Sequence, residues 1–492
     1  MEFIIEKQVL RKVKFARNEK RKITRIVVPD NVQIIDASVF KANEFVEEIV
    51  LPEGLKHIND QAFRSCIQLK RINLPESLED IGKEAFRNTA IEKISIPSKI
   101  ETIPQYCFYG CFNLSDVTLL NGLLSINKGA FYKCEALKEL EIPESVYKIE
   151  AQAFMFCDSL KIITLPSILK NLNSHLFYHC IKLENIDIPS KVTVIGDSCF
   201  YACEKLSKIT LPNSLKKIKA RAFNRCISLK NLSFPKSLKT LEMTQTFEET
   251  GLENITIPEC VKEIEYEAFR MCTNLKNITI IGNNISDVQG TAFYGTKLHE
   301  TFKSPYIIIN GVIANINDSS YEKLTIPNNV FIVGTLGFAN VGIKEIMIPA
   351  PVKIINRGAF YTYKTQKRKV CLSNSIESIG VNAFHNNYFE NLIIPGSVKQ
   401  INYGAFEIQE DDENIEYTNL ILLNGIEIIA PYSFSNVKIK ELFIPKSVKE
   451  IGKYAFNKVE KVHIYKETKY NSSGLSMWHK TFGDKTEIIE YT

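Results

Sequence analysis

The chain has 492 residues, of which 45% are hydrophobic and 24% charged, and its formal net charge is +5. A charge this close to balance gives no reason to expect nucleic-acid binding, and no apolar run is long enough to span a membrane. No uninterrupted apolar segment precedes Arg11 and Lys12, and the C-terminal end has neither a hydrophobic tail nor a lipidation motif. These features predict a cytoplasmic protein, with display on the cell surface by an unrecognised route as the alternative.

The first 40 residues are expected to form an N-terminal cap and the first turn of a repeat. Within them, residues 11–22 hold seven basic residues and one acidic residue, interleaved with Val13 and Phe15. Such a stretch could contact phosphates or an anionic membrane surface. As a hairpin loop of the cap, it is expected instead to be solvated.

A repeat dominates residues 41–293. Successive phenylalanines Phe131, Phe154, Phe177, Phe200 and Phe223 are 23 residues apart. A period of this size predicts a solenoid, in which each turn buries its apolar face against its neighbours. The Phe marker occurs 18 times, which predicts about 18 turns: Phe40, Phe63, Phe86, Phe108, Phe131, Phe154, Phe177, Phe200, Phe223, Phe247, Phe269, Phe293, Phe338, Phe360, Phe384, Phe406, Phe434 and Phe456.

Each turn has the same predicted parts. A segment L-x-x-I-x-I, as in residues 69–74, has the alternation and β-branched content of a short strand. Proline follows it, and proline belongs at a strand end because it has no N–H to donate to the ladder. Pro143, Pro166, Pro189 and Pro212 mark this point in consecutive turns. An Ala-Phe-x-x-Cys corner closes the turn, and its Phe rings are expected to stack one strand spacing apart.

Eight of the 12 cysteines occupy one position, three residues after the Phe: Cys66, Cys111, Cys134, Cys157, Cys180, Cys203, Cys226 and Cys272. Cysteines at the repeat period, without C-x-x-C spacing, predict a buried ladder of small apolar side chains rather than a metal site or a disulfide chain. Free buried thiols also favour a reducing compartment.

The register breaks at residues 294–326, which we interpret as an irregular joint before a second array at 327–456. Residues 306–338 resemble residues 3–40, since both begin with an aromatic residue and Ile-Ile and rejoin the repeat at I-P or V-P. In the second array, residues 364–369 (KTQKRK) and the acidic residues 410–413 lie where the register slips, and both are predicted to protrude as loops. Residues 457–492 are predicted to be a C-terminal cap, with Met477, Trp478 and Phe482 available to cover the last turn.

The combination of L-x-x-I-x-I, I-P-x-S-V and A-F-x-x-C in 23-residue repeats resembles the BspA-like leucine-rich repeat proteins of bacteria and some protozoa. The resemblance covers nearly the whole chain. It implies a β-rich, right-handed, curved leucine-rich-repeat solenoid with a parallel sheet on its concave side. It also implies a role in binding or adhesion rather than catalysis.

No motif suggests catalysis, a cofactor or a metal site. His175 and His179 have helix-compatible metal spacing with Cys180, but they flank the Phe177 corner, and a solvated or capping role is the better interpretation. No grouping of Ser, His and Asp belongs to a recognisable motif, and there is no P-loop or dinucleotide fingerprint. An enzyme hidden in residues 294–325 is the weakest alternative.

The predicted strands give the main clue to partner binding. The residue between the last two apolar positions of L-x-x-I-x-I points away from the core, and down the first array it is small or polar. In the second array it becomes Met347, Ile393 and Phe443. These three form either an exposed patch for a partner or a surface covered by the neighbouring inserts. With Lys364, Lys367 and Arg368 from the basic insert, they are the candidate partner-binding residues.

We therefore predict a monomeric, non-enzymatic protein-interaction scaffold that binds an unidentified protein through its concave sheet and the loops of the second array. A cell-surface adhesin for host or matrix proteins is the alternative.

Overall fold

The computed structural model describes residues 1–15, 22–298, 300, 306–316, 322–409, 416–470 and 481–492. They form two compact units. Unit 1 comprises residues 1–260 and 271–279, and unit 2 comprises residues 261–270 and 280–492. In the part of the chain that the structure describes, no helix has the length and apolar character that crossing a bilayer requires.

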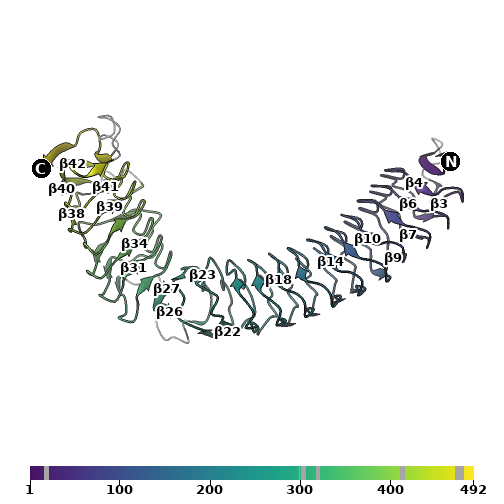
Figure 1. Cartoon of the computed structure of the whole chain (residues 1–492), viewed down its shortest axis with the longest axis horizontal. Helices are drawn as coiled ribbons and strands as arrows, with labels where there is room; N and C mark the ends of the chain where they lie inside the picture. Colours follow the sequence, from purple (N-terminus) through teal and green to yellow (C-terminus); the bar gives the residue numbers. More distant parts are fainter. Residues whose placement is uncertain (16–21, 299, 301–305, 317–321, 410–415, 471–480) are drawn as a thin grey trace. The chain divides into compact units, whose positions relative to one another are not determined.

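Each unit is a stack of similar turns, and most turns contribute two short strands (Figure 1). The strand from the L-x-x-I-x-I segment pairs in parallel with its counterpart in a neighbouring turn, which gives a row of two- and three-stranded sheets that we call the long-strand sheet. The second apolar step of each turn forms a two-residue strand, and these strands make the short-strand sheet, also parallel. The predicted β-rich solenoid with parallel sheets is confirmed.

The long-strand sheet of unit 1 comprises β3 (Arg25–Val27), β5 (Glu48–Val50), β7 (Arg71–Ile72), β9 (Lys93–Ile96), β11 (Asp116–Leu119), β13 (Glu139–Glu141), β15 (Ile162–Thr164), β17 (Asn185–Asp187), β19 (Lys208–Thr210), β22 (Asn254–Ile257) and β24 (Asn277–Ile280), whose last residue belongs to unit 2. In unit 2 it comprises β28 (Lys323–Thr325), β30 (Glu345–Met347), β33 (Lys369–Cys371), β36 (Asn391–Ile394), β38 (Asn419–Leu422), β40 (Ile439–Phe443), β42 (Val459–Tyr465) and β44 (Glu487–Tyr491).

The short-strand sheet of unit 1 comprises β2 (Val9–Lys14), β4 (Ile34–Ile35), β6 (His57–Ile58), β8 (Asp80–Ile81), β10 (Thr102–Ile103), β12 (Ser125–Ile126), β14 (Lys148–Ile149), β16 (Asn171–Leu172), β18 (Val194–Ile195), β20 (Lys217–Ile218) and β21 (Thr240–Leu241). In unit 2 it comprises β23 (Glu263–Ile264), β25 (Asp287–Val288), β27 (Val312–Ile316), β29 (Ile332–Val333), β31 (Ile354–Ile355), β34 (Ser378–Ile379), β37 (Gln400–Ile401), β39 (Ile428–Ile429), β41 (Glu450–Ile451) and β43 (Lys469–Tyr470). Four strands lie outside both sheets' regular repeat: β1 (Glu2–Glu6), β26 (Tyr306–Ile309), β32 (Gln366–Lys367) and β35 (Asn387–Tyr388).

The prolines connect the two strands of a turn. The carbonyl of each repeat proline accepts a hydrogen bond from the N–H three residues later, as from Val146 to Pro143 at 3.0 Å and from Leu169 to Pro166 at 3.2 Å. Pro189 and Pro212 make the same contact with Val192 and Leu215. Proline therefore ends the long strand and starts a tight turn that returns an apolar residue to the core.

The Phe corner is a third column of backbone hydrogen bonds. The N–H of each Phe donates to the carbonyl that precedes the Phe of the next turn, as from Phe63 to Ala85 at 2.8 Å and from Phe131 to Ala153 at 2.9 Å. In most turns the residues two before and two after the Phe have positive φ, for example Gln152 at 64° and Phe156 at 60°. Every second N–H of the corner donates to the next turn, as those of Gln61, Phe63 and Ser65 do, so strain at each corner is compensated by hydrogen bonds.

The Phe rings form a stacked ladder inside each unit. From Phe40 to Phe247 in unit 1, ring centroids of successive turns lie 5.2–6.0 Å apart, and from Phe338 to Phe456 in unit 2 they lie 5.0–5.3 Å apart. Phe482 continues the second ladder, 5.9 Å from Phe456. With it the solenoid has about 19 turns, one more than the sequence pattern predicted.

The cysteines of the repeat do more than fill space. The Sγ of each donates to the carbonyl of the preceding turn's Phe at 2.8–3.3 Å, as from Cys180 to Phe154. Where threonine takes this position, as at Thr89, its hydroxyl donates to the carbonyl of its own Phe. The same Phe carbonyl also accepts the backbone N–H three residues later, as from Cys157 to Phe154 at 3.2 Å, so the thiol adds a second donor to a carbonyl that is already paired. All 12 cysteines are free thiols.

Both arrays begin with an antiparallel hairpin. At the N-terminus, β1 and β2 form an antiparallel hairpin whose second strand pairs in parallel with β4. At the predicted joint, β26 and β27 form an antiparallel hairpin whose second strand pairs in parallel with β29. The sequence similarity between residues 3–40 and 306–338 therefore corresponds to a shared topology.

The basic insert was predicted to protrude as a loop, and this was wrong. Gln366 and Lys367 form β32, which pairs in parallel with β35, and Lys369 begins β33 of the long-strand sheet. The residues at 364–369 therefore continue the turn instead of interrupting it. The acidic residues 410–413, Met477 and Trp478 lie outside the described residues, and the predicted division at 1–40, 41–293, 294–326, 327–456 and 457–492 stays a prediction.

Candidate functional site

Two exposed columns of side chains run along the long-strand sheet. In unit 1 the first column is mostly charged, with Arg25 and Arg71 both paired to Glu48 at 3.3 and 3.4 Å, although it also holds the exposed Ile162. The second column is mostly polar, and Thr118, Thr164 and Thr210 are exposed. This is the pattern of a solvated sheet face.

In unit 2 the first column is again charged or polar, whereas the second column becomes apolar. Lys323 and Lys369 pair with Glu345 at 3.3 and 3.5 Å, and hydrogen bonds to Lys323 lower the pKa of the Glu345 carboxyl. Farther along, Asn419 donates to Asn391 at 3.1 Å.

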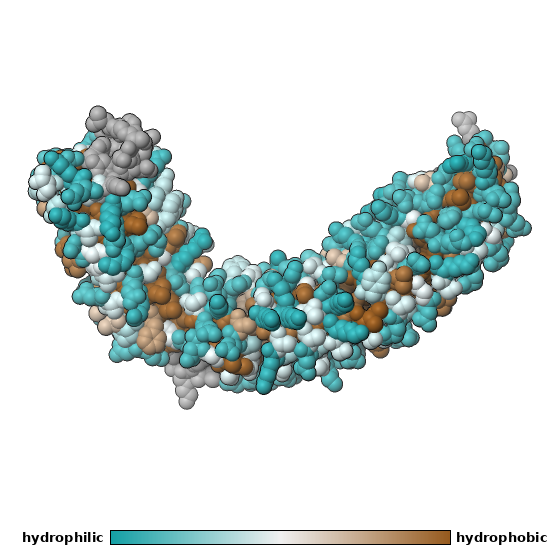
Figure 2. Space-filling view, in the orientation of Figure 1, coloured by the Kyte–Doolittle hydropathy of each residue, from teal (hydrophilic) through white to brown (hydrophobic). Residues whose placement is uncertain are grey.

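From β30 to β40 the second column of unit 2 is an apolar stripe, made of Met347, Cys371, Ile393, Ile421 and Phe443, with Thr325 before it and His463 after it. Met347 pairs with Cys371, and Ile393 pairs with Ile421, in neighbouring strands. Phe443 is 58% exposed, Ile393 52% and Ile421 42%, whereas Met347 is half-buried. Hydrophilic residues dominate the face of the molecule that Figure 2 shows, and hydrophobic residues occur there in separate patches. A row of apolar side chains this exposed is unusual for a solvated sheet.

A groove of about 950 Å³ lies beside the stripe. Cys371, Ile393 and the exposed Leu423 contribute its apolar lining, and Lys344, Lys367 and Glu390 its charged lining. The lysines are paired within the chain: Lys344 lies 2.5 Å from Glu322, and Lys367 lies 3.5 Å from both Glu390 and Glu416. The Glu416 carboxylate in particular raises the pKa of Lys367. The groove therefore offers apolar surface framed by ion pairs rather than a patch of one charge.

The three basic candidates have different environments. Lys364 and Lys367 are exposed, and Lys367 also lies 5.6 Å from the ring centroid of Tyr388. Arg368 is 3% exposed, so its guanidinium does not belong to an exposed binding surface, contrary to our prediction.

The contacts of Arg368 explain its burial. It donates to the carbonyls of Phe360 at 3.3 Å and Val341 at 2.5 Å, and burial lowers its pKa to about 10. In this turn the position that cysteine takes elsewhere is the exposed Tyr363. Arg368 and Asn387 instead satisfy the carbonyl of Phe360, so the role of Arg368 is structural.

The C-terminal end of the stripe is aromatic. The ring of His463 stacks on Phe443 with centroids 4.1 Å apart, and its two nitrogens contact Tyr491 and Glu441, each at 2.7 Å. These contacts hold the exposed Phe443 ring in one orientation. A second hollow of about 500 Å³ lies here, lined in part by Phe443, His463, Tyr465 and Tyr491.

The remaining sequence candidates are structural. His179 contacts Asp158 at 3.1 Å, and His175 lies 3.8 Å from Asp197. Both histidines have positive φ at the Phe177 corner and pack against Phe156 or Tyr178. Among the described residues there is no group of three or more His, Cys, Asp or Glu side chains suited to a metal ion.

The basic stretch at 11–22 falls partly within β2, and its residues 16–21 lie outside the described residues. Arg11 pairs with Asp36 at 2.6 Å, which lowers the pKa of that carboxyl. Val13 is buried beneath the hairpin.

The family model of the BspA type leucine-rich repeat region matches six overlapping segments: residues 33–146, 124–245, 195–310, 243–363, 304–411 and 412–482. Together they span nearly the whole sequence. The chain belongs to the BspA-type leucine-rich repeat family.

Solved structures of bacterial leucine-rich repeat proteins are similar to this BspA-type chain. A leucine-rich repeat protein from Bacteroides ovatus is 22% identical with a TM-score of 0.40, covering 100% of this chain and 97% of that one. The Treponema pallidum leucine-rich repeat protein is 22% identical with a TM-score of 0.30, covering 42% and 87%. The pneumococcal vaccine antigen PcpA is 15% identical with a TM-score of 0.34, covering 98% and 92%. No curated protein matches the chain.

Sequence reasoning missed two members of the stripe in this BspA-type protein. We recognised Met347, Ile393 and Phe443 because each is followed two residues later by the proline that ends the strand. Cys371 and Ile421 occupy the same column, but Ser373 and Leu423 stand where that proline is expected. Without that proline, and with the irregular spacing of the second array, the sequence did not show that Cys371 and Ile421 belong to the same column.

Proposed function

We propose that this protein is a non-enzymatic scaffold that binds another protein through the apolar stripe and its groove in unit 2. The observation that supports the proposal is the contrast between the two units. The same column of the same sheet is mostly polar in unit 1, and in unit 2 it is an exposed row of Met347, Cys371, Ile393, Ile421 and Phe443. A solvated sheet has no reason to keep such a row unless it is covered by a partner.

The proposed mechanism is burial of this row by a matching row of apolar side chains. Full burial of one large aliphatic or aromatic side chain contributes about 1.5–3 kcal/mol. Because Ile393, Ile421 and Phe443 are each about half exposed, covering them supplies only part of that amount per residue. Phe443 is the best candidate for an energetic anchor, since its ring is large and already held by His463. The flanking ion pairs would form the polar rim of the interface.

Site-specific photocrosslinking tests the proposal. A photoreactive phenylalanine analogue is placed at position 421 in the stripe, and a matched control places it at position 210, in the same column of unit 1. Exposure of cells to light is expected to give a defined crosslinked protein from position 421 alone, and Ile393→Ser with Phe443→Ser should abolish it. Equal crosslinking from both positions, or a crosslink that survives the double substitution, would refute the stripe as the contact surface.

The alternative is a cell-surface adhesin that uses the same stripe on a host or matrix protein. The free buried cysteines favour the cytoplasmic prediction, because thiols persist in a reducing compartment. Protease treatment of intact cells separates the two: loss of this protein, with a cytosolic marker intact, supports the adhesin.

A further inference from the structure

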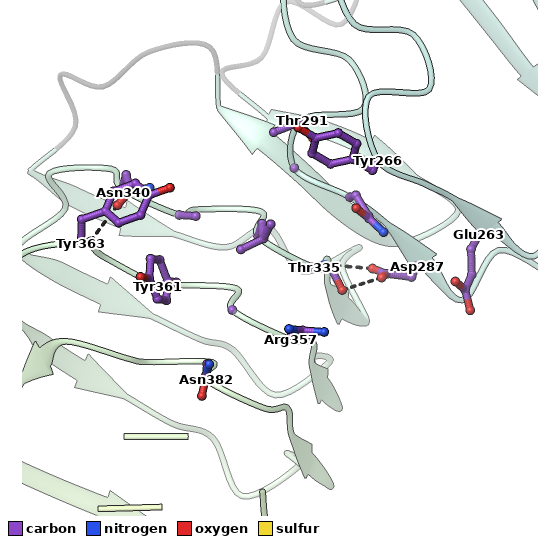
Figure 3. A pocket seen from close by; sticks show the side chains of 15 residues that line it. Glu263, Tyr266, Asp287, Thr291, Thr335, Asn340, Arg357, Tyr361, Tyr363 and Asn382 are labelled. Atoms are coloured by element: carbon purple, nitrogen blue, oxygen red, sulfur yellow. Dashed lines mark hydrogen bonds between the residues drawn. The ribbon is translucent and has the colours of Figure 1, made fainter. Parts of the chain in front are cut away.

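A third cleft lies within unit 2, on a different part of the turns, beside β25, β29 and β31 (Figure 3). Its volume is about 730 Å³, which falls in the range of small-molecule sites. Its lining comes from five turns, from Glu263 in β23 to Asn382 beyond β34. The cleft therefore arises from the joint and not from a single loop.

The floor of the cleft is rigid. Asp287 accepts hydrogen bonds from the N–H and the hydroxyl of Thr335, at 2.9 and 2.6 Å, and from the amide of Asn356 at 2.9 Å. These bonds join residues 48 and 69 positions apart in the sequence. Gly290 and Gly334 let the two backbones approach, because a Cβ on either would overlap a carbonyl oxygen of the other segment. The site is thus preformed.

Tyrosines stand on both sides of this floor. Tyr266 lies at one side, and Tyr361 and Tyr363 lie at the other (Figure 3). Tyr363 is 74% exposed, and its ring is perpendicular to that of Tyr361 with centroids 5.4 Å apart. Tyr361 in turn stacks on His385 at 5.0 Å, which fixes its orientation. Exposed tyrosine rings offer flat apolar faces with a hydroxyl at the edge.

The polar groups of the cleft are planar and of mixed charge. Glu263 and Arg357 are exposed, and neither forms an ion pair with a described residue. The side-chain carbonyl of Asn340 accepts a hydrogen bond from the N–H of Tyr363 at 2.9 Å, which holds the Asn340 amide at the cleft. Carboxylate, guanidinium and amide groups can each make two parallel hydrogen bonds to adjacent hydroxyls.

We infer that this cleft binds a short oligosaccharide. Sugar rings present apolar C–H faces that match tyrosine rings and adjacent hydroxyls that match planar carboxylate, guanidinium and amide groups. A polyphosphate is disfavoured because Glu263 and Asp287 would repel it and, among the described residues that line the cleft, Arg357 is the one basic side chain. The inference is independent of the proposed protein contact on the apolar stripe.

A glycan array tests the inference with the full-length protein. The probes are defined neutral, sialylated and sulfated oligosaccharides, and the best binder is then titrated by calorimetry. Tyr363→Ala and Tyr266→Ala are each expected to weaken binding about tenfold, the effect of losing one ring contact. Tyr363→Phe should bind within about threefold of the wild type, since the ring is kept.

Two controls make the result decisive. Tyr147→Ala removes an exposed tyrosine of unit 1, and Ile393→Ser alters the stripe; both should leave glycan binding unchanged. Failure of the wild-type protein to bind any glycan on the array overturns the inference. Glycan binding that Tyr363→Ala and Tyr266→Ala leave intact also overturns it, because the sugar then binds elsewhere.

Discussion

Replacing Phe154 with Ala should open the solenoid locally. The ring is 0% exposed and stacks between Phe131 at 5.7 Å and Phe177 at 5.8 Å. Its removal leaves a cavity bounded by two rings and costs about 3–5 kcal/mol, the usual range for a buried Phe→Ala change. Since each turn contacts only its neighbours, this cost should fall on adjacent turns rather than on the whole array.

Native-state hydrogen exchange measures this directly. The amides of Phe131 and Phe154 donate to Ala153 and Leu176 in the corner column, and their exchange should accelerate by about 100-fold to a few thousand-fold. The amide of Phe63, several turns away, should change little. The matched control is Tyr147→Ala, at a side chain that is 58% exposed. Unchanged exchange at Phe131 and Phe154, or equal acceleration at Phe63, would refute stabilisation by nearest-neighbour ring stacking.

Three further predictions concern the sheet, the thiols and the joint. Ile393→Ser should change the free energy of unfolding in urea by less than about 0.5 kcal/mol. Ile394→Ser, at the adjacent buried residue, should lower it by about 3–5 kcal/mol. Similar values for the two variants would mean that the strand register is wrong. Burial raises the pKa of Cys66 and Cys272 to about 12, and of Cys111 to about 11, from an ordinary value of 9.0. Above pH 9 the unfolded chain therefore loses thiol protons that the native state keeps. The free energy of unfolding should be constant below pH 9 and fall between about pH 9 and 12, by up to about 1.4 kcal/mol per pH unit for each thiol. In urea titrations, a Cys66→Ala variant whose free energy of unfolding falls with pH as steeply as that of the wild type would contradict this. Asp287→Ala should lower the free energy of unfolding by about 2–3 kcal/mol and speed hydrogen exchange of the Thr335 amide. The control Asp116→Ala, in an exposed ion pair, should lower it by less than about 1 kcal/mol. Equal effects of the two substitutions would show that Asp287 does not hold the joint.

The repeat could be predicted because one chemical requirement recurs at one spacing. Phe, Pro and Cys each have a single role per turn, and their recurrence every 23 residues makes all three positions recognisable in the sequence. The hydrogen bond from each thiol to a Phe carbonyl was not predictable, because the pattern shows a small side chain and not the partner that it contacts in the preceding turn. Arg368 illustrates the same limit: its charge suggested an exposed position, but its guanidinium is buried and donates to the carbonyls of Phe360 and Val341. Cys371 and Ile421 were missed because no proline marks the ends of their strands.

The second hairpin, β26–β27, bears on how the protein is synthesised. A solenoid turn buries its apolar face only against its neighbours, so the first turn of an array needs a surface to pack against. A hairpin closes locally and needs no template, since its strands are joined by Asn310 and Gly311 alone. We therefore expect the hairpin to be a local starting point for folding of the array that follows it. A lesion in the first array need not prevent the stripe-bearing array from reaching its native structure.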